Sequence, residues 1–444
     1  MTNKRVCVVG AGPSGLVSTK TLLQAGLDVD CYETSSEIGG HWVLNNPSGR
    51  SAAYKSLQTN TTKYMSRLSD FTMPEEWPDF PSCDQVRQWF CDYADHFDVR
   101  RHVQTECEVV AADPDPSGSG WTVTLQQKDG DRRTETYDGL IAASGNYWDP
   151  KRVTYDGQFD GTIVHTLGYR APDEPLETKG KHIIVVGIGT TGCELACELA
   201  MSDAASVTLS ARSGNWILPK QLDGDAAPTP PPLSHPTDPV PLPLRILPQS
   251  WRVWVFERMV EQVFKKNFKA RMARFEELGL PPPPPSPLTK RPTLAQDLMD
   301  FMEKGAIAAK PGIKRTDGRS VTFTDGSSIE ADIIFNAVGY HLSYSYLPKD
   351  IVDTSDDDLD LFLGTNVPTR DDLFIVGASR PMGAFWPIAE AQAKYAASII
   401  SGQSTLPPQS ERMRRAEPIL KRRSFNPALY GLAIQEEIAK RRSN

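Results

Sequence analysis

The sequence predicts an α/β protein with two dinucleotide-binding, Rossmann-like domains, the second of which is inserted into the first. Two glycine-rich stretches support this fold class, Gly10-Ala11-Gly12-Pro13-Ser14-Gly15 and Gly187-Ile188-Gly189-Thr190-Thr191-Gly192. Each follows a short β-branched run and precedes an apolar helical pattern, which is the strand–turn–helix order of a dinucleotide-binding unit. The length also matters, because 444 residues exceed what one hydrophobic core usually holds.

The composition narrows the class of protein. The net charge of −8, with both signs mixed along the chain, argues against nucleic acid or an anionic membrane as the main partner. Seven cysteines without a repeating spacing indicate reduced thiols and a cytoplasmic protein. Cys193 and Cys197 lie one helical turn apart, but no histidine or second cysteine pair accompanies them, so we expect no metal site. No apolar run of about 18 residues predicts a membrane-spanning helix.

The first glycine-rich stretch follows a buried-strand pattern at Arg5–Val9. In such a loop Gly10, Gly12 and Gly15 allow a tight turn, a close approach to a pyrophosphate and close packing of helix on strand. Pro13 and Ser14 begin the helix, whose free N–H groups and dipole would face the phosphates.

The second predicted strand ends in Glu33, 18 residues after Gly15. A carboxylate at this place accepts hydrogen bonds from a ribose diol and repels a 2′-phosphate, so the first nucleotide should be FAD. Gly40, His41 and Trp42 follow, and a glycine next to an aromatic residue can lie under another part of the cofactor. A turn beside a core tryptophan is an equally good interpretation.

A polar cluster around Asn60, with Thr59 and Thr61 beside it, is typical of a loop. After it come a helical pattern and three strand patterns, at Asp84–Phe97, Cys107–Val110, Trp121–Leu125 and Leu140–Ala143.

The second glycine-rich unit differs from the first in the charge of the residue after its second strand, which is basic and not acidic. Lys181–Val186 predicts its first strand and Ser206–Ser210 its second, after which Arg212 and Ser213 stand where Glu33 stood. Gly187, Gly189, Thr190, Thr191 and Gly192 would hold the phosphates. An arginine beside a hydroxyl can bind a 2′-phosphate, so the second nucleotide should be NADPH. The alternative is a surface arginine at the end of a strand.

The remaining chain contains an atypical insertion and a return to the first domain. The insertion covers about residues 223–288, and its apolar residues from Trp251 to Phe268 recur at helical spacing. They either pack this helix onto its domain or form a lid or a contact in a homodimer. Strands are predicted at Ile333–Phe335 and Asp372–Gly377, and a helix at Ile388–Ile400. The expected domains are therefore 1–165 and 337–444 for FAD and 166–336 for NADPH.

The segment between the two glycine stretches resembles the signature of the flavin-containing monooxygenases, a group of class B flavoprotein monooxygenases. The match lies at Phe159, Gly161, His165 and Tyr169, and the similarity extends over most of the chain. The resemblance implies that FAD, NADPH and O2 form a C4a-hydroperoxyflavin, which oxygenates an amine nitrogen or thioether sulfur of a small molecule. It also implies that Asn60 is catalytic and that Gln392 lies on the FAD side.

There are departures from the family pattern. Ser144 and Val338 replace the threonines that family members usually have at the two domain crossings. Animal members have a C-terminal membrane anchor, whereas residues 439–444 here are too polar to insert, so we expect a cytoplasmic protein without a membrane partner.

Three other functions share parts of this pattern. Baeyer–Villiger monooxygenases oxidise ketones with the same cofactors but typically have tryptophan where Tyr169 stands. A thiol–disulfide reductase needs a redox cysteine pair, and no C-x-x-C or C-x-x-x-x-C occurs. A flavin-binding scaffold or redox sensor would not need Glu33, Arg212 and Asn60 together.

Overall fold

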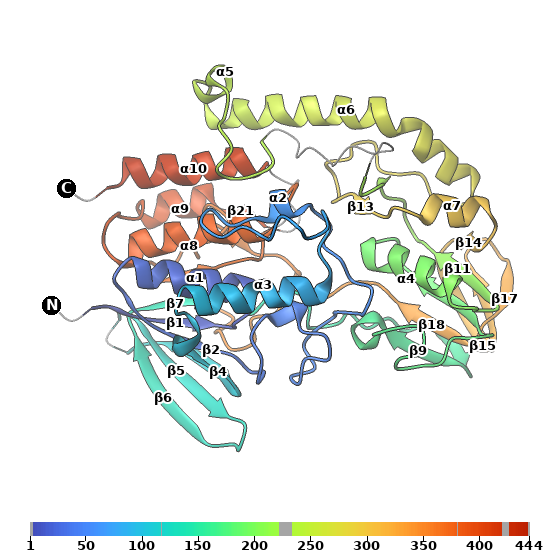
Figure 1. Cartoon of the computed structure of the whole chain (residues 1–444), viewed down its shortest axis with the longest axis horizontal. Helices are drawn as coiled ribbons and strands as arrows, with labels where there is room; N and C mark the ends of the chain where they lie inside the picture. Colours follow the sequence, from blue (N-terminus) through green and yellow to red (C-terminus); the bar gives the residue numbers. More distant parts are fainter. Residues whose placement is uncertain (1–2, 117, 222–232, 380, 420–425, 443–444) are drawn as a thin grey trace.

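Two parallel sheets of five strands form the centres of two units (Figure 1). The computed structural model describes residues 3–116, 118–221, 233–379, 381–419 and 426–442. The predicted fold class, an α/β protein with two Rossmann-like units, is confirmed.

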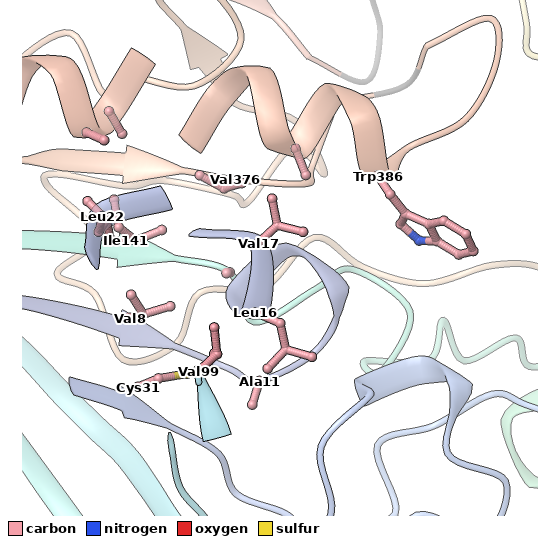
Figure 2. Close-up of a cluster of buried hydrophobic side chains, with 14 of the residues drawn as sticks. Val8, Ala11, Leu16, Val17, Leu22, Cys31, Val99, Ile141, Val376 and Trp386 are labelled. Carbon is pink, nitrogen blue, oxygen red and sulfur yellow. The ribbon is translucent and has the colours of Figure 1, made fainter. Parts of the chain in front are cut away.

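The first sheet combines strands from both ends of the chain. Its parallel order is β20 (Leu373–Ile375), β7 (Gly139–Ala142), β1 (Arg5–Val9), β2 (Asp28–Tyr32) and β3 (Val103–Gln104). Helices α1 (Pro13–Gln24), α3 (Cys83–His96), α8 (Trp386–Ile400) and α10 (Pro427–Lys440) belong to the same unit. The apolar side chains between this sheet and its helices form one buried cluster, which includes Val8, Leu16 and Ile141 (Figure 2). The strands and helices predicted from β-branched runs and helical spacing are therefore present.

An antiparallel meander lies beside this sheet. It consists of β4 (Cys107–Pro114), β5 (Trp121–Gln127) and β6 (Arg132–Tyr137). Only the first two strands were predicted. The third, with the sequence Arg-Arg-Thr-Glu-Thr-Tyr, has an exposed polar face and lacks the apolar run used to recognise the others.

The second sheet is also parallel. Its order is β14 (Ile307–Lys310), β11 (Ser206–Ser210), β10 (His182–Val186), β18 (Ile333–Asn336) and β9 (Thr162–His165), with α4 (Thr190–Met201) and α7 (Leu298–Glu303) packed nearby. A four-stranded sheet adjoins it, in the order β17 (Ser328–Glu330), β16 (Ser320–Phe323), β15 (Ile313–Gly318) and β8 (Asp156–Phe159).

The expected domain boundary at residue 165 is wrong. Strands β8 and β9 pair within the sheets of the second unit, so the chain enters this unit before Asp156. The two strands are short and half exposed, so their residues show little alternation of apolar and polar side chains. This is why the sequence predicted no strands here but a connecting segment. The last strand of the second sheet ends at Asn336.

The insertion contains one long helix, α6 (Gln249–Glu277), which extends from α10 of the first unit to the second unit (Figure 1). Its inward residues Phe256 and Val260 pack with Ala428 of α10, and Met272 and Phe275 join the core of the second unit.

The expectation that the aromatic residues of this helix pack it onto its domain is therefore only partly correct. Trp251 and Trp254 are 60% and 55% exposed, and Met259 and Val263 are also exposed. The proline-dense part of the insertion lies partly outside the described residues, since 222–232 are not among them.

Short elements complete the fold. They are α2 (Lys63–Ser66), α5 (Leu242–Arg245), α9 (Gln409–Arg415), β12 (Ile217–Leu218) paired with β13 (Thr293–Leu294), and β19 (Asp360–Leu361) paired with β21 (Glu417–Pro418), together with the 3-10 turns η1 (Gly40–Trp42), η2 (Arg100–His102) and η3 (Thr166–Gly168). Among the described residues, no helix is both long and apolar enough to cross a membrane.

Candidate active site

One large cavity of about 650 Å³ is bounded by both units. The N-terminal ends of α1 and α4 open into it, so both glycine loops contribute to a single site. The predicted residues that line it are Gly10, Gly12, Pro13, Ser14, Glu33, Gly40, His41, Trp42, Thr59, Asn60, Thr61, Gly189, Thr190 and Thr191. The structure thus brings together residues of both predicted glycine loops and of the loop that carries Asn60.

The first glycine loop is packed too tightly for side chains. A Cβ atom on Gly15 would lie 1.7 Å from the carbonyl oxygen of Gly10, and one on Gly40 would lie 2.8 Å from the Cα of Gly12. Gly15 itself lies behind the cavity and does not line it. Gly12 caps α1 without a side-chain hydrogen bond, which leaves the first N–H groups of this helix available to an anion.

Glu33 lies at the end of β2, in the cavity wall. Its carboxylate accepts hydrogen bonds from the backbone N–H of Ala11 at 2.7 Å and of Ser35 at 2.9 Å. Burial raises the pKa of Glu33, while these two donors act in the opposite direction. The carboxylate is therefore held rigidly against the glycine loop, where a ribose would lie.

Three buried polar atoms in the cavity wall have no hydrogen-bond partner within the protein. They are Nδ1 of His41, Oγ1 of Thr59 and Oδ1 of Asn60. Buried polar groups are rarely left without partners, because the loss of hydration costs about 1–3 kcal/mol each. These atoms therefore fit a site whose polar ligand completes their hydrogen bonds.

The second glycine loop repeats the first. A Cβ atom on Gly192 would lie 2.1 Å from the carbonyl oxygen of Gly187, and Gly187 has a φ of +113°. Gly189 caps α4 without a side-chain hydrogen bond. Gly187 and Gly192 shape the loop from behind, whereas Gly189, Thr190 and Thr191 face the cavity.

Arg212 and Ser213 lie outside the cavity wall, just beyond the end of β11. The side chain of Arg212 packs against Gly312, where a Cβ atom would lie 2.8 Å from its Cγ. Nζ of Lys290 donates a hydrogen bond to Oγ of Ser213 at 3.1 Å. Lys290 and Ser213 are therefore in contact directly after Arg212 in the chain, at the strand end where the sequence predicts the 2′-phosphate of NADPH.

Gln392 does not line the cavity. It is fully buried, accepts a hydrogen bond from the N–H of Gly377 at 2.9 Å and donates to the carbonyl oxygen of Gly364 at 2.8 Å. The expected direct contact with FAD is thus replaced by support of Gly377, which does line the cavity.

Trp42 contacts both the cavity and the core, and its expected contact with the cofactor stays a prediction. Trp42 lines the cavity, and its ring also packs edge-on against Trp386, with 5.6 Å between the ring centroids. Trp386 belongs to the buried cluster of the first unit (Figure 2).

His165 is a structural histidine that holds a domain crossing. Its Nδ1 accepts a hydrogen bond from the N–H of Leu167 at 3.0 Å, so Nε2 donates to the carbonyl oxygen of Gly339 at 3.0 Å. Burial lowers the pKa of His165 and keeps the ring neutral. The segment from Phe159 to Arg170 is thereby tied to Gly339, where the chain passes back from the second unit to the first.

Sequence reasoning missed several residues of the cavity wall. Arg291 lies there with its guanidinium 4.6 Å from the ring centroid of Phe385, and Asn215 and Glu194 also line the cavity. A signal for Arg291 existed, because Lys290-Arg291-Pro292 directly follows the insertion. Glu194 and Asn215 gave no signal, since their position depends on the approach of the two units.

The chain matches a known protein family over almost its whole length. The family model described as flavin-binding monooxygenase-like covers residues 3–440. The mouse protein dimethylaniline monooxygenase [N-oxide-forming] 2 is 32% identical over 428 residues, which are 92% of this chain and 76% of the relative.

The chain belongs to the flavin-binding monooxygenase-like family.

Solved structures of similar fold include several flavin monooxygenases. The S-allyl-L-cysteine S-oxygenase of Allium sativum superposes with a TM-score of 0.70 at 21% identity, covering 100% of this chain and 90% of that one. Cyclohexanone monooxygenase bound to ε-caprolactone also superposes with a TM-score of 0.70, at 16% identity and with coverage of 99% and 98%. These likenesses support the two-unit architecture of a flavin monooxygenase.

The flavin-binding monooxygenase-like chain is an enzyme that uses FAD, NADPH and O2. The site fits these cofactors. The glycine cradle, Glu33 and the unpartnered atoms of His41, Thr59 and Asn60 could hold FAD, whereas α4, Arg212 and Ser213 could hold NADPH.

Proposed function

We propose that this monooxygenase oxygenates a soft nucleophile, an amine nitrogen or a thioether sulfur, of a small molecule. Bound FAD, reduced by NADPH, supplies the oxygen atom from O2. The observation that carries the proposal is the buried Oδ1 of Asn60, which has no hydrogen-bond partner in the cavity wall and whose chain neighbours Thr59 and Thr61 are uncharged. A heteroatom attacks through its own lone pair, so this reaction requires no charged base near the substrate.

The protein's own contribution is to orient groups and exclude water. Burial lowers the pKa of His41 to about 4, so its ring is neutral at physiological pH. The amide of Asn60 donates and accepts hydrogen bonds without titrating, which suits a polar group that must not lose a proton. Trp42, Phe385 and Trp386 supply apolar wall and limit the access of water.

The experiment that tests this proposal uses the FAD-loaded protein. NADPH is added without oxygen, air is then admitted, and products are measured for panels of tertiary amines, thioethers and cyclic ketones. We expect bleaching of the flavin by NADPH, followed by formation of N-oxide or S-oxide. Ester or lactone formation without any N-oxide or S-oxide would overturn the heteroatom assignment, and absence of bleaching would overturn the enzyme assignment.

One observation favours oxidation of ketones as a second candidate. Arg291 places a permanent cation in the cavity wall, and a cation stabilises negative charge on a carbonyl oxygen under attack. Arg291→Ala should then abolish ketone oxidation and leave amine oxygenation largely intact. Equal losses for both substrates would indicate that Arg291 serves cofactor binding instead.

A further inference from the structure

A polar contact joins the second unit to the segment that leads into the Asn60 loop. Glu194 lies on α4, one turn after Thr190 and Thr191, and its Oε2 accepts a hydrogen bond from the hydroxyl of Tyr54. Its other oxygen, Oε1, pairs with Nζ of Lys220 at 2.6 Å. One carboxylate of α4 thus contacts both Tyr54, in the segment before the Asn60 loop, and a lysine of the second unit.

The contact lies at the cavity. Tyr54 and Glu194 both line the cavity, and the side chains of Glu194 and Lys220 are mostly buried, at 20% and 12% exposure. Burial raises the pKa of Tyr54 well above its usual value, with Glu194 as the second cause, so the phenol stays protonated and donates. A charge-assisted hydrogen bond from a protonated phenol is stronger than a neutral one.

Backbone hydrogen bonds hold the segment between Tyr54 and the Asn60 loop. The N–H of Leu57 closes a turn onto the carbonyl oxygen of Tyr54 at 3.0 Å, and the carbonyl of Leu57 accepts from Cys83 at 2.8 Å. The N–H of Thr59 donates to Pro81 at 3.0 Å. Thr59 therefore lies only five positions after Tyr54, and backbone hydrogen bonds hold Leu57 and Thr59 against Cys83 and Pro81.

We propose that Glu194 is a positioning residue, which transmits occupancy of the nucleotide site at the start of α4 through Tyr54 to the loop that carries Asn60. NADP⁺ held at Thr190 and Thr191 would fix the first turns of α4, and the Glu194–Tyr54 contact would fix the loop in turn. The enzyme would thereby order its oxygenation site only while the oxidised nucleotide is present. The inference rests on the proposed function only in giving Asn60 its role.

The test measures loop order directly. Hydrogen–deuterium exchange of the segment 57–62 is followed in the FAD-loaded full chain, with and without saturating NADP⁺. In the wild type we expect NADP⁺ to slow exchange of this segment. In Tyr54→Phe and Glu194→Gln that protection should fall by about tenfold, the ratio expected when one buried hydrogen bond to a charged group is lost. The same variants should release several times more hydrogen peroxide per NADPH than the wild type.

Two controls make the result specific. Ser56→Ala removes the neighbouring hydrogen bond from Ser56 to Glu198, at 2.9 Å, which joins the same segment to the same helix outside the cavity wall. It should leave the protection by NADP⁺ unchanged. The double variant Tyr54→Phe/Glu194→Gln should lose no more protection than Tyr54→Phe alone, because the hydrogen bond that Glu194→Gln weakens is already absent in that variant.

Three results would overturn the proposal. They are no protection of 57–62 by NADP⁺ in the wild type, full protection in Tyr54→Phe at saturating NADP⁺, or additive losses in the double variant. The exchange measurement needs only bound FAD and NADP⁺. If no substrate is oxygenated, the proposed function fails while this inference is still decided on its own evidence.

Discussion

Substitution of Asn60 is the most direct test of the proposed oxygenation site. Its Oδ1 is buried in the cavity wall without a partner in the protein and is therefore available to accept a hydrogen bond from a bound ligand. Asn60→Ala should retain FAD but form at least about tenfold less oxygenated product per NADPH, since one lost polar contact at a reacting centre typically costs this much or more. The measurement is hydrogen peroxide released against NADPH consumed. Unchanged coupling would remove Asn60 from the catalytic residues.

Arg212 is the residue that we expect to favour NADPH over NADH. Arg212 lies just beyond the end of β11 and is followed by Ser213, which accepts a hydrogen bond from Lys290; this is the place where the sequence predicts a 2′-phosphate. Arg212→Ala should lower the ratio of kcat/KM for NADPH over NADH by about 10- to 100-fold, as expected for a lost charge-assisted hydrogen bond. Arg212→Lys, which keeps the charge, should lose less. A ratio that stays constant in both variants would assign the phosphate to other residues.

His41 predicts a pH dependence of stability. Its pKa in the folded protein is about 4, lowered from 6.5 by burial and then by Arg170. As the pH falls, His41 therefore takes up a proton in the unfolded chain before it does so in the folded protein. The contribution of neutral His41 to the free energy of unfolding is complete above pH 6.5 and is lost between pH 6.5 and 4. From pH 7.5 to pH 5 the free energy of unfolding should fall by about 2 kcal/mol on account of His41 alone.

The measurement is chemical unfolding at both pH values, in the wild type and in His41→Asn. The variant should show a pH dependence that is smaller by this amount. His165 and His235 also have lowered pKa values and remain in the variant, so part of the dependence persists. An identical pH dependence in both proteins would mean that His41 is accessible to protons.

At the scale of residues, the sequence predicted those site residues whose position depends only on nearby residues in the chain. The glycines, Glu33 and the polar loop at Asn60 lie at fixed distances from a predicted strand or helix, and they line or shape the cavity. Glu194 and Arg291 reach the cavity only because segments far apart in sequence meet there. The support of Gly377 by Gln392 is likewise a tertiary contact that spacing does not reveal.

At the scale of elements, two of the three glycines of the second loop, Gly189 and Gly192, have separable roles. Gly192 faces the carbonyl of Gly187, where a Cβ atom would lie at 2.1 Å, whereas a Cβ atom on Gly189 would meet nothing within 4 Å. Gly192→Ala should distort the loop and lower the stability of the second unit by about 1–3 kcal/mol. Gly189→Ala should leave stability unchanged and raise the KM for NADPH, because it fills the space at the helix start.

Thermal unfolding and the KM for NADPH distinguish the two variants, and retention of FAD in both serves as the control for the first unit. If Gly189→Ala changed neither stability nor KM, the nucleotide would not approach the start of α4.

The strand, glycine loop and helix of each nucleotide unit follow one another directly in the chain, which explains why these elements were predicted well. Strands β8 and β9 were not, because they are short and exposed and take their place only through pairing with β15 and β18.

At the scale of the whole molecule, α6 connects the two units outside the active site (Figure 1). Its first half packs on α10 through Phe256 and Val260, and its second half packs on the second unit through Met272 and Phe275. The helical spacing predicted the helix but not this connection, since the same periodicity suits a helix on one domain and a helix across two.

Two aromatic residues of α6, two positions apart, therefore provide a final prediction. Phe256 is 8% exposed and lies in the contact with α10, whereas Trp254 is 55% exposed. Phe256→Ala should lower the stability by about 3 kcal/mol and make residues 249–262 susceptible to limited proteolysis, because a buried aromatic ring is lost. Trp254→Ala should cost no more than about 0.5 kcal/mol, as is usual for an exposed side chain. If Trp254→Ala were as destabilising as Phe256→Ala, and the more so at higher protein concentration, the exposed face of α6 would be covered in solution by a second copy of the chain, as the expected homodimer requires.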